Sequence, residues 1–383
     1  MSERIRILHL ITDLYLGGAE LMLYKLVSRM DRSAFEIEVG SLTEPGVVGD
    51  KIRALDLPLG SLGMRRGLPN PLGLARLVRK LRRNPPDLIQ TWMYHADLVG
   101  GLAAWLAGGR VPVVWGIRNS TLEPGKSKRS TIWTAQLCAR LSRRLTTGIV
   151  CCSKAAWQVH EKWGYTTERI EIIPNGFDLQ TLKPDPDARQ SVGHELNLAP
   201  DALLIGLVAR FDPQKDHATF IQAAGKLASR FPQVQFLLCG GEVTPDNPVL
   251  RQWIVQAGIE SRCHLLGPRD DIPRLTAALD VATLSSSYGE AFPNAVGEAM
   301  ACGVPCVVTD VGDSKEIVGE TGKVIPVKDP EALAEAWGQL IDLGEEGRRG
   351  IGAAARRRME QNFDLDRIAR TYEAFYRDVL SKE

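Results

Sequence analysis

Short apolar runs alternate with longer amphipathic segments along the whole chain. This alternation is typical of βαβ units, in which parallel strands are joined by helices. The strands predicted in the first half are Ile5–Ile11, Phe35–Ser41, Leu88–Trp92, Val111–Trp115 and Thr147–Cys151. Those predicted in the second half are Leu203–Ala209, Val234–Cys239, Cys263–Leu266, Val281–Leu284 and Cys306–Thr309. The pattern predicts an α/β protein with two doubly wound, Rossmann-like domains.

A polar, proline-rich stretch at residues 174–186 separates the two sets of strands and is predicted to be an interdomain linker. A chain of 383 residues is long enough for two domains of ordinary size. We therefore predict one domain over residues 1–175, a second over residues 176–362 and a terminal segment over residues 363–383. The terminal segment contains a helix predicted over 364–379, with apolar positions at Leu365, Ile368, Tyr372, Phe375 and Tyr376.

Composition and apolar run lengths indicate whether the protein spans a membrane, carries a signal peptide or contains disulfides. The longest apolar candidate for a membrane span, Leu98–Ala107, is far shorter than the ~18 residues that a span needs. The apolar run at the N-terminus ends at Asp13, which favours a first strand over a signal peptide. The seven cysteines form no Cys-x-x-Cys pair and lie mostly in apolar runs, as expected of core residues in a reducing compartment. These features predict a cytoplasmic protein.

The net charge of +1 conceals an asymmetry between the two halves. Residues 1–170 contain 25 Lys and Arg against 14 Asp and Glu, whereas the remainder contains 22 against 32. Basic clusters occur at Arg65 and Arg66, at 79–83, at 126–129 and at 140–144. They favour an anionic partner, most simply a phospholipid surface, so peripheral attachment at the inner face of the membrane is predicted. Solvated helix faces are the alternative, and nucleic acid is disfavoured because no aromatic residues are interleaved with the charges.

The most informative segment is residues 285–298, which follows the predicted strand Val281–Leu284. It contains Glu290 and Glu298, separated by seven residues, and leads into a helix predicted over Ala295–Cys302. Pro293 is predicted to take the first helical position, and Gly303 is predicted to end the helix. A helix N-terminus after a strand favours an anion such as a phosphate or a sugar diphosphate. If the ligand is a nucleotide sugar, one carboxylate faces the sugar and the other holds the ribose. A strand–loop–helix unit without a ligand is the alternative.

Two other segments follow predicted strands. Gly17 and Gly18 open a helix after the first strand, but they do not form the Gly-x-Gly-x-x-Gly pattern of dinucleotide dehydrogenases. Arg210 and Lys215 follow Leu203–Ala209, before a helix that Asp216 is predicted to cap. An arginine that binds bidentately beside a lysine point charge is suited to a diphosphate. The alternative is an exposed charged loop.

Together these segments resemble the retaining glycosyltransferases of family 4, which have the GT-B fold. The similarity spans essentially the whole chain and is carried by residues 17–20, residues 173–178, Arg210 with Lys215, and residues 290–305. The most specific part is the Glu-x7-Glu motif with its Ala-Met-Ala-x-Gly-x-Pro continuation. The resemblance implies two Rossmann-like domains facing across a cleft, the first binding the acceptor and the second the donor. It also implies that the C-terminal helix returns to the first domain.

The resemblance assigns roles to the matching residues. Arg210 and Lys215 match the pair that holds the donor diphosphate, Glu298 matches the glutamate on the ribose, and Glu290 the one beside the donor sugar. Gly18 matches the glycine near the reacting diphosphate. The loop that orients sugar and phosphate, and the region of the nucleobase pocket, supply the other predicted donor-binding residues: Phe292, Pro293, Asn294, Ala295, Gly267 and Arg269.

One position departs from the family pattern. A histidine often follows the strand predicted at Val111–Trp115, and here Arg118 stands in its place, which can donate hydrogen bonds but cannot act as a base. His95, after Leu88–Trp92, is a candidate for contact with the acceptor, and a structural histidine is the alternative. Arg118, His95 and Glu290 are the predicted catalytic residues.

The sequence thus predicts a retaining hexosyltransferase that moves a sugar from a UDP- or GDP-sugar to a hydroxyl of a lipid-linked or polysaccharide acceptor. Front-face attack is favoured over a covalent step on Glu290. No cofactor is expected, and transfer is predicted to be independent of metal because the one Asp-x-Asp, at Asp185 and Asp187, lies in the predicted linker. The alternatives are another nucleotide-sugar enzyme of the same fold, such as an epimerase, and a nucleotide-sugar-binding module without turnover.

Overall fold

The computed structural model describes residues 4–64, 71–123 and 125–382, so Arg65 and Arg66 lie outside the described residues. The chain divides into two compact units. Unit 1 comprises Met1–Gly176 with Leu365–Glu383, and unit 2 comprises Phe177–Asp364. The divisions lie one and two residues from the boundaries predicted at 175 and 362.

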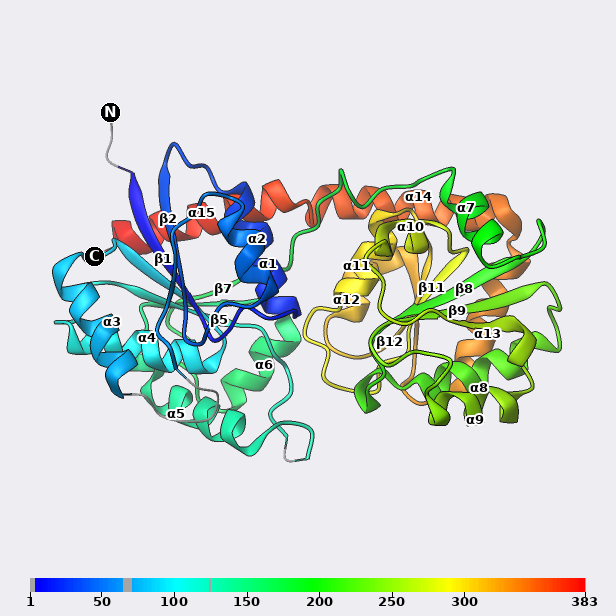
Figure 1. The fold of residues 1–383 in the computed structure, drawn as a ribbon, viewed down its shortest axis with the longest axis horizontal. Coiled ribbons are helices and arrows are strands. Elements are labelled where there is room, and N and C mark those ends of the chain that lie inside the picture. The colour runs from blue at the N-terminus through cyan, green and yellow to red at the C-terminus, as the bar shows by residue number, and fades with distance from the viewer. Residues whose placement is uncertain (1–3, 65–70, 124, 383) are drawn as a thin grey trace. The chain divides into compact units, whose positions relative to one another are not determined.

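Unit 1 contains a parallel sheet of seven strands in the order β3-β2-β1-β4-β5-β6-β7 (Figure 1). The strands are β1 (Ile5–Ile11), β2 (Phe35–Ser41), β3 (Leu59–Ser61), β4 (Leu88–Trp92), β5 (Val113–Ile117), β6 (Gly148–Cys151) and β7 (Ile170–Ile172). The predictions for β1, β2 and β4 are confirmed to the residue. The prediction for β5 was two residues early, because Pro112 has no N–H for a sheet ladder and the strand continues through Gly116 and Ile117.

The helices of unit 1 are α1 (Gly18–Arg29), α2 (Val47–Arg53), α3 (Pro71–Arg83), α4 (Tyr94–Leu106), α5 (Arg129–Leu145), α6 (Lys154–Lys162) and α15 (Leu365–Ser381). The C-terminal helix α15 packs against α1, and its five predicted apolar positions are all buried. Figure 1 shows α15, in red, running along the blue N-terminal elements of the same unit. The predicted return of the last helix to the first domain is therefore confirmed.

Unit 2 contains a parallel sheet of six strands in the order β10-β9-β8-β11-β12-β13. The strands are β8 (Leu203–Val208), β9 (Val234–Cys239), β10 (Cys263–Leu265), β11 (Val281–Leu284), β12 (Cys306–Thr309) and β13 (Gly322–Ile325). Its helices are α7 (Ala188–Glu195), α8 (His217–Ala228), α9 (Pro248–Ala257), α10 (Ile272–Ala277), α11 (Asn294–Ala301), α12 (Ser314–Val318), α13 (Pro330–Asp342) and α14 (Gly344–Asn362), with 3-10 turns η1 (Pro213–Lys215), η2 (Glu260–Arg262) and η3 (Gly319–Thr321).

Three strands were missed by the sequence pattern, and all three lie at sheet edges: β3, β7 and β13. Each is three or four residues long and largely exposed or half-buried. Edge strands are often short and polar, since an unpaired apolar edge promotes aggregation. They therefore lack the apolar run by which the central strands were found.

The predicted linker was wrong in its extent. Most of residues 174–186 belongs to unit 2. The guanidinium of Arg356, on α14, donates hydrogen bonds to the carbonyl oxygens of Leu179 at 3.0 Å and Leu182 at 2.5 Å. This proline-rich segment is therefore bonded to α14 and is not a free linker.

Both units follow the same winding, in which the strand order reverses after the first three strands. The reversal lies between β1 and β4 in unit 1 and between β8 and β11 in unit 2. In doubly wound sheets, ligands bind outside the carboxyl ends of the strands at this switch point. The loops after these four strands are therefore where the candidate residues should be sought.

Candidate active site

In unit 2, two separate sequence segments meet at the switch point. The strands β8 and β11 are paired neighbours, with Val281 opposite Ile205 and Ala282 opposite Gly206. The chain leaves β8 towards Arg210 and Lys215, and it leaves β11 towards Glu290. Because parallel strands end at the same edge, the predicted cations and the predicted carboxylate lie at one edge of the sheet.

Lys215 and Glu290 form an ion pair across these loops, 75 positions apart in sequence. The Lys215 Nζ bonds Oε1 of Glu290, and the Ser286 hydroxyl donates to the same oxygen at 2.7 Å. The side chains of Lys215 and Glu290 are only 18% and 8% exposed. A charged pair largely removed from water interacts more strongly than a surface pair, so the two groups fix each other's position.

Serines directly after β11 hold the two loops together. The Ser285 hydroxyl donates to the carbonyl oxygen of Lys215 at 2.7 Å, and the Ser287 N–H donates to that of Gln214 at 2.8 Å. The roles of these serines and of Ser286 were missed at the sequence level. The available signal was three consecutive serines after a buried strand, since serine hydroxyls readily bond nearby backbone groups.

Gly312, in the loop after β12, is a second feature that sequence reasoning missed. Its φ is +59°, and a Cβ at this position would lie 2.0 Å from the carbonyl oxygen of Glu290. Only glycine allows this approach of one backbone to another. The N–H of the next residue, Asp313, donates to the carbonyl oxygen of Ala291 at 3.1 Å, so the loop after β12 packs against the backbone at Glu290 and Ala291.

Arg210 is placed differently from Lys215. Its side chain is 61% exposed and lies 3.2 Å from the carboxylate of Asp212 through Nε and Nη2. Asp212 is half-buried and also accepts a hydrogen bond from the Gln214 N–H at 2.9 Å, so it is fixed by its own loop, whereas the Arg210 side chain is accessible to an incoming anion. The prediction that Asp216 caps the following helix is confirmed, since its side chain accepts a hydrogen bond from the Thr219 N–H at 3.2 Å.

The helix after the loop, α11, begins one residue earlier than predicted. Pro293 is its N-cap in extended conformation, and the first helical residue is Asn294, so the placement of Pro293 inside the helix was wrong. An N-cap residue keeps non-helical backbone angles, which Pro293 does with ψ of 105°. Gly303 follows the C-cap with φ of +76°, as predicted for the stop. Glu298 lies half-buried on α11.

The rest of the predicted donor loop surrounds the start of α11. Phe292 is buried, whereas Asn294 and Ala295 are half-buried in the first helical turn. The N–H groups of a first turn have no acceptor within their own helix, which suits them to an anionic ligand.

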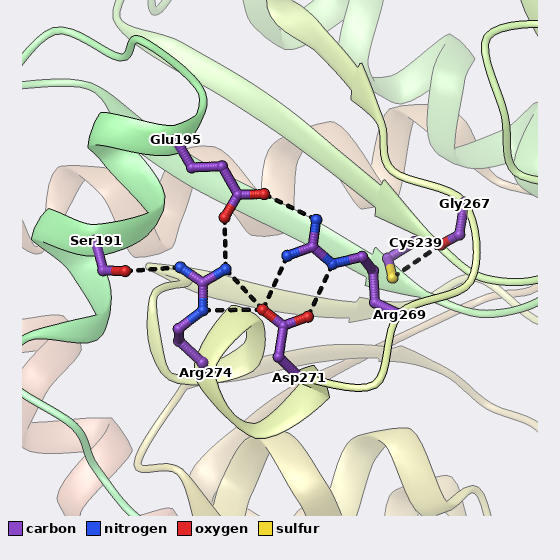
Figure 2. Close-up of polar contacts among 7 residues, drawn as sticks. All are labelled: Ser191, Glu195, Cys239, Gly267, Arg269, Asp271 and Arg274. Carbon is purple, nitrogen blue, oxygen red and sulfur yellow. Dashed lines mark hydrogen bonds and ion pairs between the residues drawn. The ribbon is translucent and has the colours of Figure 1, made fainter.

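Arg269, predicted near the nucleobase, has its guanidinium engaged by two carboxylates of unit 2 (Figure 2). It binds Asp271 bidentately, at 2.8 and 2.9 Å, and reaches Glu195 at 2.8 Å. Arg274 bonds the same two acids. Hydrogen bonds from Arg269 lower the pKa of Asp271, and those from Arg274 lower the pKa of Glu195. The four side chains link α7 to the start of α10.

Gly267 precedes this cluster and lies where three loops meet. Its carbonyl oxygen accepts hydrogen bonds from the Gly240 N–H at 2.9 Å and from the Cys239 thiol at 3.2 Å. Its own N–H donates to the carbonyl oxygen of Val243 at 2.8 Å. The loop at Gly267 is therefore fixed by hydrogen bonds to its own backbone. The side chain of Arg269 fixes the same loop through Asp271 and Glu195.

In unit 1, Gly18 is the first residue of α1 and is exposed, with Gly17 as the N-cap. His95 is the second residue of α4, and its Nε2 lies 3.5 Å from the Thr134 hydroxyl. Burial lowers the pKa of His95, so its imidazole is neutral at neutral pH.

Arg118, directly after β5, has its guanidinium occupied within unit 1. Nη1 donates to Asn175 Oδ1 at 2.8 Å and Nη2 donates to the Tyr372 hydroxyl. The guanidinium carbon lies 4.5 Å from the centre of the Trp92 ring, within the range of a cation–π contact. Arg118 thus joins the end of β5 to α15.

Two family profiles match the chain. The profile "Glycosyltransferase Family 4" matches residues 16–181, and the profile "Glycosyl transferases group 1" matches residues 202–342. A protein named "Putative glycosyltransferase EpsF", from Bacillus subtilis (strain 168), is 30% identical over 328 residues, which cover 81% of this chain and 80% of EpsF. The chain belongs to the group 1 glycosyltransferase family.

Two further relatives match almost the whole glycosyltransferase. The UDP-Gal:alpha-D-GlcNAc-diphosphoundecaprenol alpha-1,3-galactosyltransferase of Escherichia coli is 26% identical over 357 residues, 89% of each chain. The crystal structure of Anabaena Alr3699/HepE in complex with UDP-glucose is 26% identical, with 99% of this chain and 100% of HepE covered and a TM-score of 0.83. The fold predicted from the sequence, GT-B, is confirmed by this likeness.

The matched segments of the glycosyltransferase contain the predicted site residues. Gly18, His95 and Arg118 lie in the Family 4 match, and the residues from Arg210 to Glu298 lie in the group 1 match. Within residues 4–64, 71–123 and 125–382, no three His, Cys, Asp or Glu side chains gather as a metal site would require. In the same residues, none of the helices has the length and apolar character to cross a membrane.

Proposed function

We propose that this glycosyltransferase moves a sugar from a nucleotide diphosphate sugar, with UDP-sugars foremost, to a hydroxyl of a lipid-linked or polysaccharide acceptor. The proposal includes retention of the anomeric configuration and independence of metal. Unit 2 binds the donor in this proposal, and unit 1 binds the acceptor.

The observation that carries the proposal is the buried pair of Lys215 and Glu290 at the switch point of unit 2. Arg210, on the same loop as Lys215, is exposed and is paired with the half-buried carboxylate of Asp212. A diphosphate needs cations that are already in place and a helix start close by. The loops after β8 and β11 supply Lys215, Arg210 and the start of α11, and Glu298 is the fifth residue of that helix.

Breaking the bond between sugar and diphosphate leaves extra negative charge on the nucleotide, which must be stabilised as it develops. Lys215, Arg210 and the first turn of α11 provide positive potential there. Each charge-assisted hydrogen bond of this kind contributes roughly 1.5–3 kcal/mol. In front-face attack, the leaving phosphate takes the proton of the acceptor hydroxyl, and Glu290 holds Lys215 and faces the donor sugar.

The names of the relatives support the choice of substrates. HepE has been crystallised with UDP-glucose and with UDP, which supports testing UDP-sugars before GDP-sugars as donors. The galactosyltransferase of Escherichia coli is named for a diphosphoundecaprenol acceptor. A lipid-linked acceptor is therefore the first class to test, and the neutral His95 in unit 1 is a candidate to contact it.

The same proposal includes an anionic membrane surface, bound by one helical layer of unit 1. The helices α3 and α5 both lie beside α4, and together they carry nine Lys and Arg and no Asp or Glu. Trp105, on α4, is 61% exposed and Trp133, on α5, is 65% exposed. Exposed tryptophans among basic residues are typical of surfaces that lie on anionic lipid.

We expect the purified protein to sediment with phosphatidylglycerol vesicles but not with neutral vesicles, and salt to weaken this binding. Replacing both tryptophans by alanine should reduce the bound fraction, whereas Val255→Ala, an exposed apolar change in unit 2, should not. Equal binding of both vesicle types would remove the membrane from the proposal.

The donor site is tested by binding of UDP, GDP and ADP without metal, measured by calorimetry and thermal shift. We expect UDP to bind selectively. Glu298→Ala should weaken this binding strongly, because the ribose hydroxyls lose the carboxylate that accepts their hydrogen bonds. Glu346→Ala, which removes an exposed acid at the start of α14, is the matched control and should bind as wild type. Binding of UDP to both variants alike would contradict the assignment of Glu298.

The reaction itself is tested by offering a UDP-sugar with and without a polyprenol diphosphate sugar, in the presence of a chelator. A glycosylated product whose anomeric coupling in the NMR spectrum matches the donor supports retaining, metal-independent transfer. An isomerised sugar without acceptor would identify an epimerase, and binding without any product would identify a binding module. Activity lost to the chelator and restored by magnesium would overturn metal independence.

A further inference from the structure

Phe177 is the first residue of unit 2 and is completely buried. Its backbone is fixed by the other end of the unit, since its N–H donates to the carbonyl oxygen of Phe363 at 2.9 Å and it forms a parallel bridge with Asp364. The residue follows Asn175 and Gly176 in the segment 173–178.

The ring of Phe177 occupies the place of the side chain that Gly297 lacks. A Cβ on Gly297 would lie 2.2 Å from Cζ of Phe177 and less than 3 Å from both Cε atoms. No such approach is possible for two carbon atoms, so any side chain at position 297 must displace the ring or the helix. Because Phe177 is surrounded on all sides, the ring cannot turn out into water.

The same ring belongs to an aromatic cluster under the donor loop. Phe292 lies 6.3 Å from Phe177 and 5.6 Å from Phe363, measured between ring centres. Both separations are within the range of favourable aromatic pairs. Phe292 and Phe363 are 8% and 7% exposed, so the cluster is part of the core of unit 2.

A second contact fixes the far end of the same helix. Arg356 donates to the carbonyl oxygen of Ala301, the last residue of α11, at 2.6 Å, and the same guanidinium bonds Leu179 and Leu182. The segment that begins with Phe177 is thereby joined to both the middle and the end of α11. The position of this helix is set by that segment as well as by the sheet.

We propose that Phe177 is a positioning residue for the donor nucleotide sugar. Through its contact with Gly297, the Phe177 ring determines how closely α11 approaches the segment that begins at Phe177. Through its contact with Phe292, the ring determines the path of the donor loop. Glu298 is the residue after Gly297, and Glu290 is two residues before Phe292, so both carboxylates of the motif follow movements of the ring. This inference rests on the proposed function, since it takes Glu298 and the loop at 290–293 as the donor site.

The physical consequence is a donor site that is sensitive to the volume of a side chain which does not touch the donor in the proposed arrangement. Phe177→Leu leaves a cavity between the segment and α11, which then relaxes inward. In Gly297→Ala, the added methyl group pushes α11 away from the Phe177 ring, which is the opposite displacement. Displacements below 1 Å at groups that hold a reacting ligand lower its rate or affinity by large factors.

The experiment compares four variants with wild type by UDP calorimetry, thermal melting and steady-state kinetics with a UDP-sugar. They are Phe177→Leu, Gly297→Ala, the double variant and the control Phe220→Leu. Phe220 is equally buried in unit 2 but packs against Phe236 and Trp337, away from α11. We expect Phe177→Leu to weaken UDP binding roughly tenfold and to raise KM for the donor more than it lowers kcat. The control should melt at a similarly reduced temperature and bind UDP as wild type.

The double variant separates positioning from damage. The smaller leucine at position 177 leaves room for the methyl group introduced at position 297, so the double variant should bind UDP more tightly than Gly297→Ala alone. The inference is overturned if Phe177→Leu and Phe220→Leu have the same UDP affinity, or if the double variant shows simple addition of the two losses. Wild-type protein that binds no UDP would instead contradict the proposed function, so the two failures are distinct.

Discussion

The two sheets have the same winding, but the charged residues beyond the carboxyl ends of their strands are held differently. In unit 2 the loops after β8 and β11 hold the Lys215–Glu290 pair and an exposed Arg210. In unit 1 the loop after β5 holds Arg118, whose guanidinium is occupied by Asn175, Tyr372 and the face of Trp92. The two regions carry similar residue types, because each places a cation directly beyond the carboxyl end of a strand.

The difference lies in what the cations hold. Arg118 bonds neutral groups and connects β5 to α15, so its hydrogen bonds serve the packing of unit 1. Lys215 bonds the carboxylate of Glu290, in the loop that leads into α11, and the exposed Arg210 is paired with Asp212 on its own loop. Topology therefore determines where a ligand can bind, while the partners of each side chain determine whether it is available for a ligand.

The largest effect on this comparison is expected from removing the positive charge of Lys215 in unit 2. We expect Lys215→Ala to lower kcat by about two to three orders of magnitude, because a positive charge at the developing diphosphate is lost. The assay is transfer from a UDP-sugar under saturating donor. Arg349→Ala removes an exposed arginine paired with Glu345 in the same unit and should leave kcat unchanged.

Lys215→Arg refines this prediction, since it keeps the charge and changes its geometry. It should recover part of the lost rate, because Glu290 then retains a cationic partner. A variant Lys215→Ala with wild-type kcat would show that the pair with Glu290 is a structural contact like that of Arg118.

The corresponding change in unit 1 should act on stability. Arg118→Ala removes the guanidinium that donates to Asn175 and Tyr372, and we expect the free energy of unfolding to fall by about 2 kcal/mol. The affinity for UDP, measured by calorimetry at a temperature where the variant is folded, should stay within a factor of about two. A large loss of kcat without a loss of stability would return Arg118 to the catalytic role that the sequence predicted for it.

Much of this arrangement could be predicted from sequence, and the exceptions have physical causes. Central strands were located because burial on both faces gives continuous apolar runs, as in Leu203–Val208. Edge strands such as β13 were missed because they are partly exposed. The spacing of Glu290 and Glu298 and the sequence position of Lys215 were visible, but their contact across 75 positions depends on the order of the strands.

Roles set by packing were beyond the sequence. Arg269 and Arg118 were predicted to serve the ligand because of where they follow strands, yet their partners are Asp271, Glu195, Asn175 and Tyr372. Those partners lie on other elements, and nothing in the local pattern announces them. Gly297 likewise reads as an ordinary helix residue until the ring of Phe177 is placed beside it.

The smallest predicted difference between the units is in their dependence on pH. Asp97, on α4 of unit 1, is completely buried, and its Oδ1 accepts hydrogen bonds from the Thr91 hydroxyl at 2.5 Å and from the Gly116 N–H at 3.3 Å. Burial raises its pKa to about 8. Burial also lowers the pKa of His160, in unit 1, and of His217, in unit 2, to about 4 each.

The signs of these shifts are opposite. A histidine with a lowered pKa stabilises the fold above its unfolded pKa of 6.5, and this contribution is lost as the pH falls through 6.5 towards 4. Asp97 has a raised pKa, so its contribution is complete below its unfolded pKa of 3.8 and is lost as the pH rises towards 8. The unfolded histidines are half protonated at pH 6.5 and almost fully neutral by about pH 7.5, so from there to pH 8 Asp97 is the one of these three groups whose titration lowers the stability.

We therefore expect the melting temperature to fall between about pH 7.5 and 8, with a slope in the free energy of unfolding of at most about 1.4 kcal/mol per pH unit. Asp97→Asn should flatten this slope, because its amide oxygen still accepts from Thr91 and Gly116 but carries no charge at any pH. Asp56→Asn is the control, since Asp56 is exposed in unit 1 and its left-handed backbone suits asparagine. If the control and Asp97→Asn have the same pH profile, the difference between the units does not extend to proton binding. If only Asp97→Asn is flat, the loss of stability with rising pH is due to the buried acid of unit 1.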